Sequence, residues 1–422
     1  MATDGAAETV EISGHIIDEG VLSSMLDDIR GYGGDYAIVD MRVGKDSGDT
    51  STARIEVRAD TEQDLQRLLM RLQTRGANML DPGDLQLMVA DADGVFPDSF
   101  YSTTNLATQV WLAGRWVGVE QPEMDCGLEV FGPPDAPRVR TVAMSDVRAG
   151  MQIVCSASGV RVIPLPRADI NDEFGFMDSE VSSEKPHAVL IRRVADGMRA
   201  AKAAGKKVLW VGGPAIVHTG AAPALVAMVD AGFVDVLFAG NALATHDIES
   251  SLYGTSLGVD LGQARGVKHG HEHHIRAINQ IRRCGSIVAA VDQGVLTGGV
   301  MHALVRSGGR YVLVGSVRDD GPLPEVYTDV LDGQRAMRAE LYSDSAPGET
   351  SIGYCLMVAT MLHSVATGNI LPASIPLVCV DINPATVTKL ADRGSSQAQG
   401  IVTDVGLFLH QLAAELTSYS IR

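Results

Sequence analysis

The second half of the chain contains five short runs of apolar and β-branched residues, and this pattern is the strongest constraint on its fold. Continuous apolar strands of this kind are typical of parallel sheets that helices cover on both faces. Glycine-rich or polar residues follow each run, and longer segments separate the runs. We therefore predict an α/β fold with a doubly wound, Rossmann-like dinucleotide-binding domain over residues 185–422. The predicted strands are 206–212, 234–240, 310–316, 376–382 and 400–405.

The first hundred residues alternate strand and helix patterns in a different order. Strands are expected at 9–17, 35–44 and 51–59, and a helix capped by Thr61 follows the third strand. The order βαββα, completed by a further short strand, is that of ferredoxin-like α+β domains. We predict such a domain for residues 1–100.

Residues 101–184 contain short β-like runs broken by Gly, Pro and Asp, which predicts a small β-rich subdomain that can contact a substrate. One turn of this subdomain carries Glu123, Asp125 and Cys126. The two carboxylates can bind an amine or act as acid and base, or they are solvated acids at a strand end. Cys126 has no identifiable partner histidine, so a buried inert thiol is favoured over a nucleophile.

Composition excludes several functional classes. A length of 422 residues corresponds to two or three domains at about 150 residues each. Lys and Arg number 34 against 52 Asp and Glu, and this net charge of −18 argues against nucleic acid or an anionic membrane as a partner. Five widely spaced cysteines without a CxxC pair indicate a reducing compartment. We expect a cytoplasmic protein, because the N-terminus lacks signal-peptide features and no apolar stretch reaches the roughly 18 residues of a membrane span.

The residues that follow the predicted strands form the candidate ligand site. Ligands of open α/β sheets bind beyond the carboxyl ends of the strands. The glycine-rich segment 212–220 can approach a pyrophosphate, although a tight turn with Thr219 as a helix N-cap explains it equally well. An Asp or Asn at such a position can bind a ribose hydroxyl or an adenine edge. The candidate cofactor residues are Gly212, Gly213, Ala215, His218, Thr219, Gly220, Gly240, Asn241, Gly315, Ser316, Asp381, Asn383 and Asp404.

A histidine-rich segment, HGHEHH at 269–274, suggests a metal site. It is not the zinc motif HExxH, because Ile275 stands where the second histidine is required. Adjacent histidines at a helix start point in different directions, so we favour a polar helix cap or a substrate contact and expect no metal site. His271 and His274 lie one helical turn apart and can reach a common ligand.

Long sequence blocks resemble a known family, the archaeal-type ornithine cyclodeaminases, from about Thr9 to Leu416. The N-terminal segment resembles the conserved region of bifunctional lysine-ketoglutarate reductase/saccharopine dehydrogenases. The C-terminal domain resembles deoxyhypusine synthase, and the whole chain resembles the C-terminal part of bifunctional arginine dihydrolase/ornithine cyclodeaminases. The blocks are GGPAIVHTG, AGNALATHDIE, GTSLGVDL, AVDQGVLTGGVM, GSVRDDGPLPEV, CVDINPATVTKLADRGS and GIVTDVGLFL.

The resemblance implies an NAD-dependent ammonia-lyase that converts ornithine to proline and ammonia. NAD would oxidise the α-carbon to an imine, the δ-amine would close the ring, and the cyclic imine would take the hydride back. Asp404 matches the position that holds the adenosine part of NAD in deoxyhypusine synthase, whereas the catalytic lysine of that enzyme has no clear counterpart here. Candidate acid or base residues are Asp125, Glu123, Asp247 and His271, and candidates for the substrate carboxylate are Arg318 and Lys268.

Two alternatives remain beside the lyase, and we expect a homo-oligomer in each case. One is an NAD-dependent amino-acid dehydrogenase with net redox. The other is a non-catalytic NAD-sensing regulatory protein. Incubation with ornithine separates the three, because a lyase releases ammonia without lasting NADH, a dehydrogenase accumulates NADH and a sensor does neither.

Overall fold

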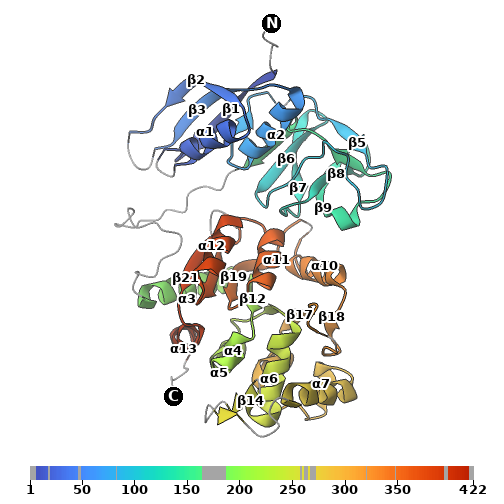
Figure 1. Cartoon of the computed structure of the whole chain (residues 1–422), viewed down its shortest axis with the longest axis vertical. Coiled ribbons are helices and arrows are strands. Elements are labelled where there is room, and N and C mark those ends of the chain that lie inside the picture. Colours follow the sequence, from blue (N-terminus) through green and yellow to red (C-terminus); the bar gives the residue numbers. More distant parts are fainter. Residues whose placement is uncertain are drawn as a thin grey trace. The chain divides into compact units, whose positions relative to one another are not determined.

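The computed structural model describes residues 6–17, 20–45, 49–81, 83–163, 187–256, 259–260, 265–266, 272–319, 321–346, 348–393 and 398–417. It divides into two compact units (Figure 1), and each is described by itself. Unit 1 comprises Met1–Gly175 with Ile370–Ser374, and unit 2 comprises Phe176–Asn369 with Ile375–Arg422. Within the described ranges, no helix combines the length and the apolar character that crossing a membrane requires.

The first sheet of unit 1 has the predicted ferredoxin-like topology. Its strands lie in the order β2-β3-β1-β4, and every neighbouring pair is antiparallel. The Thr61 hydroxyl caps α2 by accepting the Asp64 N–H, and α2 buries Leu65, Leu68 and Leu72 against the sheet. The elements are β1 (Ala6–Gly14), α1 (Val21–Gly31), β2 (Asp35–Arg42), β3 (Ser51–Ala59), α2 (Glu62–Gln73) and β4 (Asn78–Met79).

The second sheet of unit 1 is the predicted β-rich part. Its order is β11-β6-β7-β9-β8-β10-β5, and all pairs are antiparallel except β7 with β9. Tyr101, Val110, Leu128 and Val139 pack in its core. The strands are β5 (Leu87–Val89), β6 (Ala107–Leu112), β7 (Arg115–Glu120), β8 (Gly127–Phe131), β9 (Arg138–Val142), β10 (Gln152–Val154) and β11 (Val160–Ile163), with the 3-10 turn η1 (Met144–Asp146).

A parallel sheet forms the centre of unit 2 and confirms the doubly wound prediction. Its order is β18-β17-β13-β12-β19-β20-β21, and all its pairs are parallel. Apart from the edge strand β18, this is the 3-2-1-4-5-6 order of Rossmann folds, with the switch point between β12 and β19. The strands are β12 (Lys207–Gly212), β13 (Val236–Ala239), β17 (Arg310–Val314), β18 (Val326–Tyr327), β19 (Ile352–Val358), β20 (Leu377–Asp381) and β21 (Ala398–Val402).

Strand β19 is absent from the five strands that the sequence predicts. Gly353 interrupts its apolar run, and only two of its seven residues are β-branched. Its partners β12 and β20 pair with it on both sides, so tertiary contacts override a weak local preference. The missing strand matters because it forms one side of the switch point.

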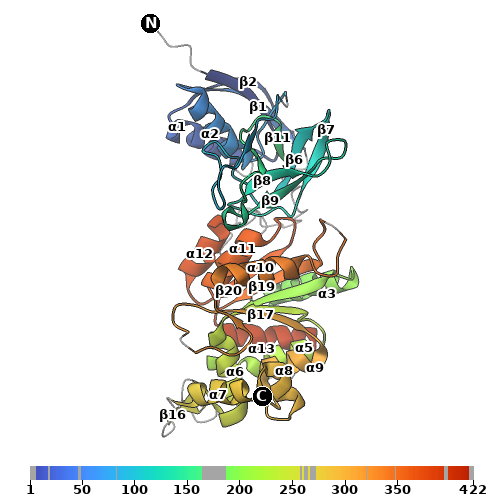
Figure 2. The same ribbon diagram turned by 90° about the vertical axis from the view of Figure 1, so that its right-hand side faces the viewer.

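Helices cover both faces of the parallel sheet, as Figure 2 shows. On one face lie α10, α11 and α12, and on the other lie α5, α6, α9 and α13. Alternate strand residues such as Trp210, Leu356 and Val378 pack against the second layer. The helices are α3 (His187–Ala203), α4 (Ala215–His218), α5 (Ala222–Asp230), α6 (Asn241–Tyr253), α7 (His273–Cys284), α8 (Ile287–Asp292), α9 (Gly299–Ser307), α10 (Val330–Leu341), α11 (Leu362–Ile370), α12 (Pro384–Arg393) and α13 (Val405–Leu416), and a small antiparallel sheet contains β14 (Thr255–Ser256), β15 (Val259–Asp260) and β16 (Arg265–Gly266).

A carboxylate of α6 holds the start of α9. The Asp247 side chain is 1% exposed, and its two oxygens accept the N–H groups of Val300 and Met301, each at 2.8 Å. The N-cap of α9 is Gly298, which has no side chain to do this. Gly299 has φ +89°, and a Cβ there would lie 2.6 Å from an Asp247 oxygen. The contacts therefore give Asp247 a structural role as the cap of a neighbouring helix.

The pKa of Asp247 makes this cap dependent on pH. Burial raises the pKa to about 6 from 3.8, and the two N–H donors oppose part of that rise. A carboxyl group whose pKa is higher in the folded state stabilises the fold most below about pH 4. This contribution, on the order of 3 kcal/mol, is lost as the pH rises through 6.

Asp247→Asn should therefore flatten the pH dependence of stability in unit 2. The difference in unfolding free energy between wild type and variant should shrink by about 3 kcal/mol from pH 4 to pH 7. Urea unfolding followed by Trp210 fluorescence measures it, with Trp111→Phe and Trp116→Phe in both proteins so that only unit 2 is observed. A difference that stays constant or grows with pH would contradict the prediction.

Candidate active site

The structure brings the thirteen predicted cofactor residues to one edge of the parallel sheet. They occupy the ends of β12, β13, β17, β20 and β21 or the turns that follow them. Because all these strands are parallel, their carboxyl ends meet along the same side, which we call the carboxyl edge. Whether each residue contacts a cofactor stays a prediction.

A hydrogen-bonded network fixes the loops that follow β13 and β17. Asn241 donates its amide N–H to Asp319 at 3.0 Å and accepts the Leu323 N–H at 3.1 Å. Asp319 also accepts the Ser316 N–H at 2.8 Å. Both ends of the Asn241 amide are therefore used within the protein. Its side chain holds the β17 loop against the start of α6.

The glycine-rich turn after β12 packs against the turn after β19. The Gly213 N–H donates to the Val358 carbonyl at 2.9 Å, and a Cβ on Gly213 would lie 1.8 Å from the Ala359 carbonyl oxygen. Only glycine fits there. Ala359 itself has φ +54°, an uncommon conformation for a residue with a side chain. The missing side chain of Gly213 therefore lets the turns after β12 and β19 pack together at the switch point, whatever ligand the same turn binds.

The interpretation of Thr219 as a helix N-cap is wrong. Its hydroxyl donates back to the Ala215 carbonyl at 2.8 Å, so Thr219 ends α4, and the N-cap of α5 is Ala221. The reason is the short helix α4, which the sequence pattern does not separate from α5. Thr219 instead lies close to the start of α13, because a Cβ on Gly406 would lie 3.3 Å from both Thr219 and Asp404.

Two carboxylates lie at the ends of the neighbouring strands β20 and β21. One oxygen of Asp381 accepts the Asn383 N–H at 2.8 Å, and one oxygen of Asp404 accepts the Leu407 N–H at 2.7 Å. The second oxygen of each has no hydrogen bond to any residue that the structure describes. Paired acceptors of this kind can bind the hydroxyls of a ribose.

Large apolar side chains are exposed along the same edge. Val317 is fully exposed, and Leu362 and Ile382 are 69% and 67% exposed. They follow β17, β19 and β20, and Met361 and Leu407 add to the row. The sequence alone does not reveal them, because exposure depends on the tertiary structure. Exposed apolar groups beside polar ones are typical of ligand sites.

A second group of polar side chains lies where α4, α6, α7 and β14 meet (Figure 1). His246 Nδ1 is 2.8 Å from Glu249 Oε2, and the Glu249 side chain is fully buried. The Thr255 hydroxyl donates to the other Glu249 oxygen at 2.9 Å. We call this group the histidine cluster. Its members are His218, His246, Glu249, Thr255, Ser256, His273 and His274.

His218 connects the histidine cluster to the turn after β12. Its Nδ1 is 2.7 Å from the Ser256 hydroxyl, and its ring centre is 4.8 Å from that of His246. Burial lowers the pKa of His218, as does the neighbouring His246, while Glu249 partly raises it. The His218 ring is therefore held towards its neutral form, in which one nitrogen accepts a proton.

The remaining predicted residues are dispersed. Arg318 is exposed in the loop after β17 at the carboxyl edge. Lys268 and His271 lie outside the described residues. Glu123 and Asp125 belong to unit 1, where Glu123 is buried and Asp125 is exposed with φ +61°. Cys126, also in unit 1, is buried as the inert-thiol interpretation expects.

Sequence reasoning missed the functional candidates His246, Glu249 and His363. His246 and Glu249 stand three residues apart on one helix face, a spacing that was available as a signal. His363 Nε2 lies 3.2 Å from the Val314 carbonyl, and burial lowers its pKa. No signal pointed to His363, because it follows the unpredicted strand β19. Within the described residues, no three His, Cys, Asp or Glu side chains are grouped as metal ligands.

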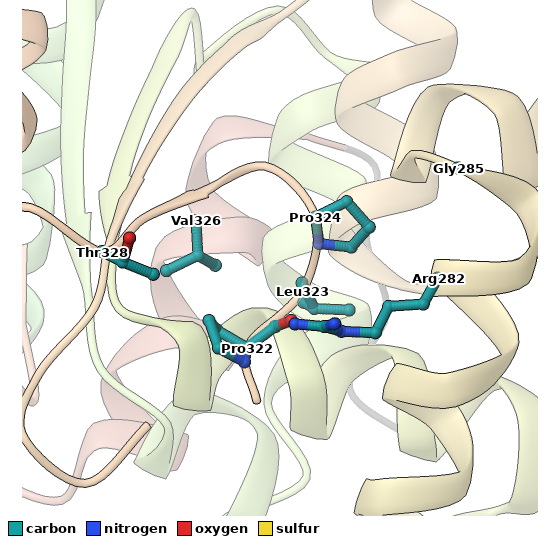
Figure 3. Close-up of a pocket in the computed structure, with 7 residues that line it drawn as sticks. All are labelled: Arg282, Gly285, Pro322, Leu323, Pro324, Val326 and Thr328. Atoms are coloured by element: carbon teal, nitrogen blue, oxygen red, sulfur yellow. The ribbon is translucent and has the colours of Figure 1, made fainter. Parts of the chain in front are cut away.

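A cavity of about 460 Å³ lies apart from the predicted residues (Figure 3). Arg282, near the end of α7, donates to the Pro322 carbonyl at 2.9 Å and lies along one wall. Gly285 and residues of the segment around β18 form the rest of the lining. None of the predicted site residues lines this cavity, so we do not assign it to the site at the carboxyl edge.

Three adjoining regions of the chain match known families. Residues 7–106 match the LOR/SDH bifunctional enzyme conserved region. Residues 107–191 match the first region of the arginine dihydrolase ArgZ-like C-terminal part, and residues 192–412 match its Rossmann fold.

Similar proteins share these regions over nearly the whole chain. An ornithine cyclodeaminase of Methanothermobacter thermautotrophicus is 49% identical and aligns over 96% of this chain and 97% of its own length. The ornithine cyclodeaminase of Methanopyrus kandleri is 48% identical, with 97% of each chain aligned.

Solved structures agree with these matches. The apo structure of ArgZ, a cyanobacterial arginine dihydrolase, has a TM-score of 0.83 at 34% identity over 97% of this chain and 58% of its own. A complex of AgrE with ornithine and NAD+ has a TM-score of 0.51 at 37% identity over 97% of this chain and 57% of its own. Since the sequence agreement is this high over nearly all of its length, the chain belongs to the archaeal-type ornithine cyclodeaminases, a family of NAD-dependent ammonia-lyases.

Proposed function

We propose that the chain converts L-ornithine to L-proline and ammonia at the carboxyl edge of unit 2, with bound NAD. The observation that carries this proposal is the parallel sheet, whose Rossmann order places exposed apolar side chains along one edge, together with carboxylate oxygens that bond to no described residue. The names of the relatives support ornithine as the substrate, and the AgrE complex contains both ornithine and NAD+.

The residues at the carboxyl edge are suited to a dinucleotide. The oxygens of Asp381 and Asp404 that bond to no described residue would accept hydrogen bonds from ribose hydroxyls. Leu362 and Ile382 would pack against the flat rings of the dinucleotide, because apolar side chains line most ligand sites of this kind. The phosphate contacts expected of Gly213 and Thr219 stay proposals, since the structure engages both residues within the protein.

NAD supplies a hydride acceptor that takes hydrogen from the α-carbon and returns it after ring closure, with no net redox. The protein has to bind the substrate and move protons. Arg318 would bind the ornithine carboxylate, because it is exposed in the loop after β17 and its guanidinium forms no ion pair with any described residue. Asp125 and Glu123 belong to unit 1, and a contact of either residue with the amine stays a prediction from the sequence.

Isotopic labels test the reaction. Ornithine carrying deuterium at the α-carbon should give proline that retains the deuterium in ordinary water, with no NADH consumed or accumulated. Ornithine carrying heavy nitrogen at the α-amine should release labelled ammonia, because the δ-nitrogen closes the ring. Mass spectrometry of both products measures this. Unlabelled proline, ammonia from the δ-nitrogen or accumulating NADH would contradict the proposal, and NADH would instead indicate the dehydrogenase.

Asp404→Asn tests the cofactor site. The variant keeps an oxygen that can cap α13 but loses the charge offered to a ribose, so NAD affinity should fall about 10- to 150-fold. Asp329→Asn is a matched control, because Asp329 caps α10 in the same way by accepting the Leu331 and Asp332 N–H groups. Calorimetric titration with NAD measures both variants. Equal affinities in Asp404→Asn and Asp329→Asn would remove Asp404 from the site.

Asp125→Asn tests the amine contact. Loss of one charge-assisted hydrogen bond should lower kcat/KM for ornithine by about 10- to 150-fold, while NAD affinity stays unchanged. Asn tolerates the left-handed conformation at this position, so the turn is retained. Asp135→Asn, at another exposed turn of unit 1, is the control. Unchanged turnover in Asp125→Asn would leave Asp125 as a surface acid.

A further inference from the structure

The histidine cluster contains an oriented pair, His246 and Glu249. The two residues stand on the same face of α6, and Nδ1 of His246 is 2.8 Å from Oε2 of Glu249. An ionised carboxylate only accepts hydrogen bonds, so the neutral ring must carry its proton on Nδ1. This leaves Nε2 with a lone pair. No described residue forms a hydrogen bond with Nε2, which is thus able to take up a proton.

Glu249 is itself fixed from a second side. The Thr255 hydroxyl donates to Oε1 at 2.9 Å, and the same hydroxyl is 2.8 Å from His273 Nδ1. Since the hydroxyl has one proton to donate, the His273 N–H donates to Thr255. Three elements, α6, β14 and α7, therefore hold one fully buried carboxylate. Such a chain of hydrogen bonds fixes the orientation of the ring that it supports.

The pair lies close to the carboxyl edge. His218 ends α4, which directly follows the Gly212–Gly213 turn at the switch point, and its ring is 4.8 Å from His246. Along α6, His246 is only five residues beyond Asn241, the first residue of the helix. At about 1.5 Å per residue this separation is about 8 Å. A small amino acid bound at the edge spans that distance.

We propose that His246 transfers the proton at the ring-closing step and that Glu249 is its positioning residue. This inference rests on the proposed function. When the δ-nitrogen attacks the α-carbon, a carbon–nitrogen bond forms and the bond to the α-nitrogen breaks. The δ-nitrogen has to lose a proton, and the departing nitrogen has to gain one. Nε2 of His246 accepts the first and donates the second, so the step balances without any electron transfer.

The geometry also separates this role from that of the neighbouring histidines. His218 is engaged with Ser256 through Nδ1 and its ring is edge-on to His246. His273 is engaged with Thr255, and the ring centre of His274 is 6.2 Å from that of His246. Within the part of the chain that the structure describes, His246 is the member of the histidine cluster whose ring contacts a carboxylate directly. A carboxylate partner strengthens a histidine as a base and stabilises its protonated form.

The test compares His246→Gln and Glu249→Gln with two matched controls. His302→Gln removes a histidine on α9 outside the cluster, and Glu340→Gln removes a buried carboxylate that pairs with Arg310 at 3.1 Å. Ammonia release from ornithine gives kcat and KM, and calorimetry gives NAD affinity. His246→Gln should lower kcat at least 100-fold, Glu249→Gln should lower it at least 10-fold, and both should leave KM and NAD affinity within threefold of wild type.

A readout independent of turnover comes from nitrogen NMR of ¹⁵N-histidine protein. The neutral ring of His246 should carry its proton on Nδ1 in wild type and in both controls. In Glu249→Gln the amide can present either its oxygen or its NH2 group to Nδ1, so the two tautomers should mix. A glutamate that did not orient the ring would leave the single tautomer unchanged. A wild-type proton on Nε2, or kcat within threefold of wild type in His246→Gln, would overturn the inference. Wild-type protein that releases no ammonia from ornithine would instead overturn the proposed function itself, and the inference with it.

Discussion

The backbone contact between Gly213 and Ala359 joins the two halves of the parallel sheet at its switch point. The absence of a side chain on Gly213 lets the turn after β12 meet the turn after β19, and Ala359 accepts a left-handed conformation to complete the contact. Because these two turns pack together, the ends of the strands form one continuous edge. The carboxylates that follow β20 and β21 and the exposed apolar side chains then lie along the same edge.

Buried carboxylates connect this edge to the helical layer. Asp247 and Glu249 are only two residues apart on α6, yet they do different things. Asp247 accepts two backbone N–H groups at the start of α9, whereas Glu249 accepts hydrogen bonds from side chains that can move protons. Because a buried charge is costly unless donors satisfy it, both positions constrain the packing around α6. One helix therefore links the stability of unit 2 to its proposed chemistry.

The histidine cluster lies next to the carboxyl edge, along α4 and α6. His218 ends the short helix after β12, and His246 follows the end of β13 by less than two helical turns. A Rossmann sheet brings such helix starts together because every crossover begins at the carboxyl edge. Under the proposed function, an amino acid bound at that edge would have the hydride acceptor on one side and His246 on the other, as an internal deamination requires.

The sequence by itself determined the fold class, since apolar strands alternating with helices specify a doubly wound sheet and the βαββα order specifies the ferredoxin-like domain. It also placed the candidate cofactor residues at strand ends, where the structure finds them. Tertiary structure alone decided the rest. Strand β19 forms through its neighbours, so His363 and the exposed Leu362 were invisible before it. The role of Asp247 depends on α9, more than fifty residues away in the chain. The spacing of His246 and Glu249 is visible in the sequence, but only the structure shows that Glu249 is buried and paired. Local patterns encode elements, whereas contacts between distant elements determine which polar groups are buried, paired or left free for chemistry.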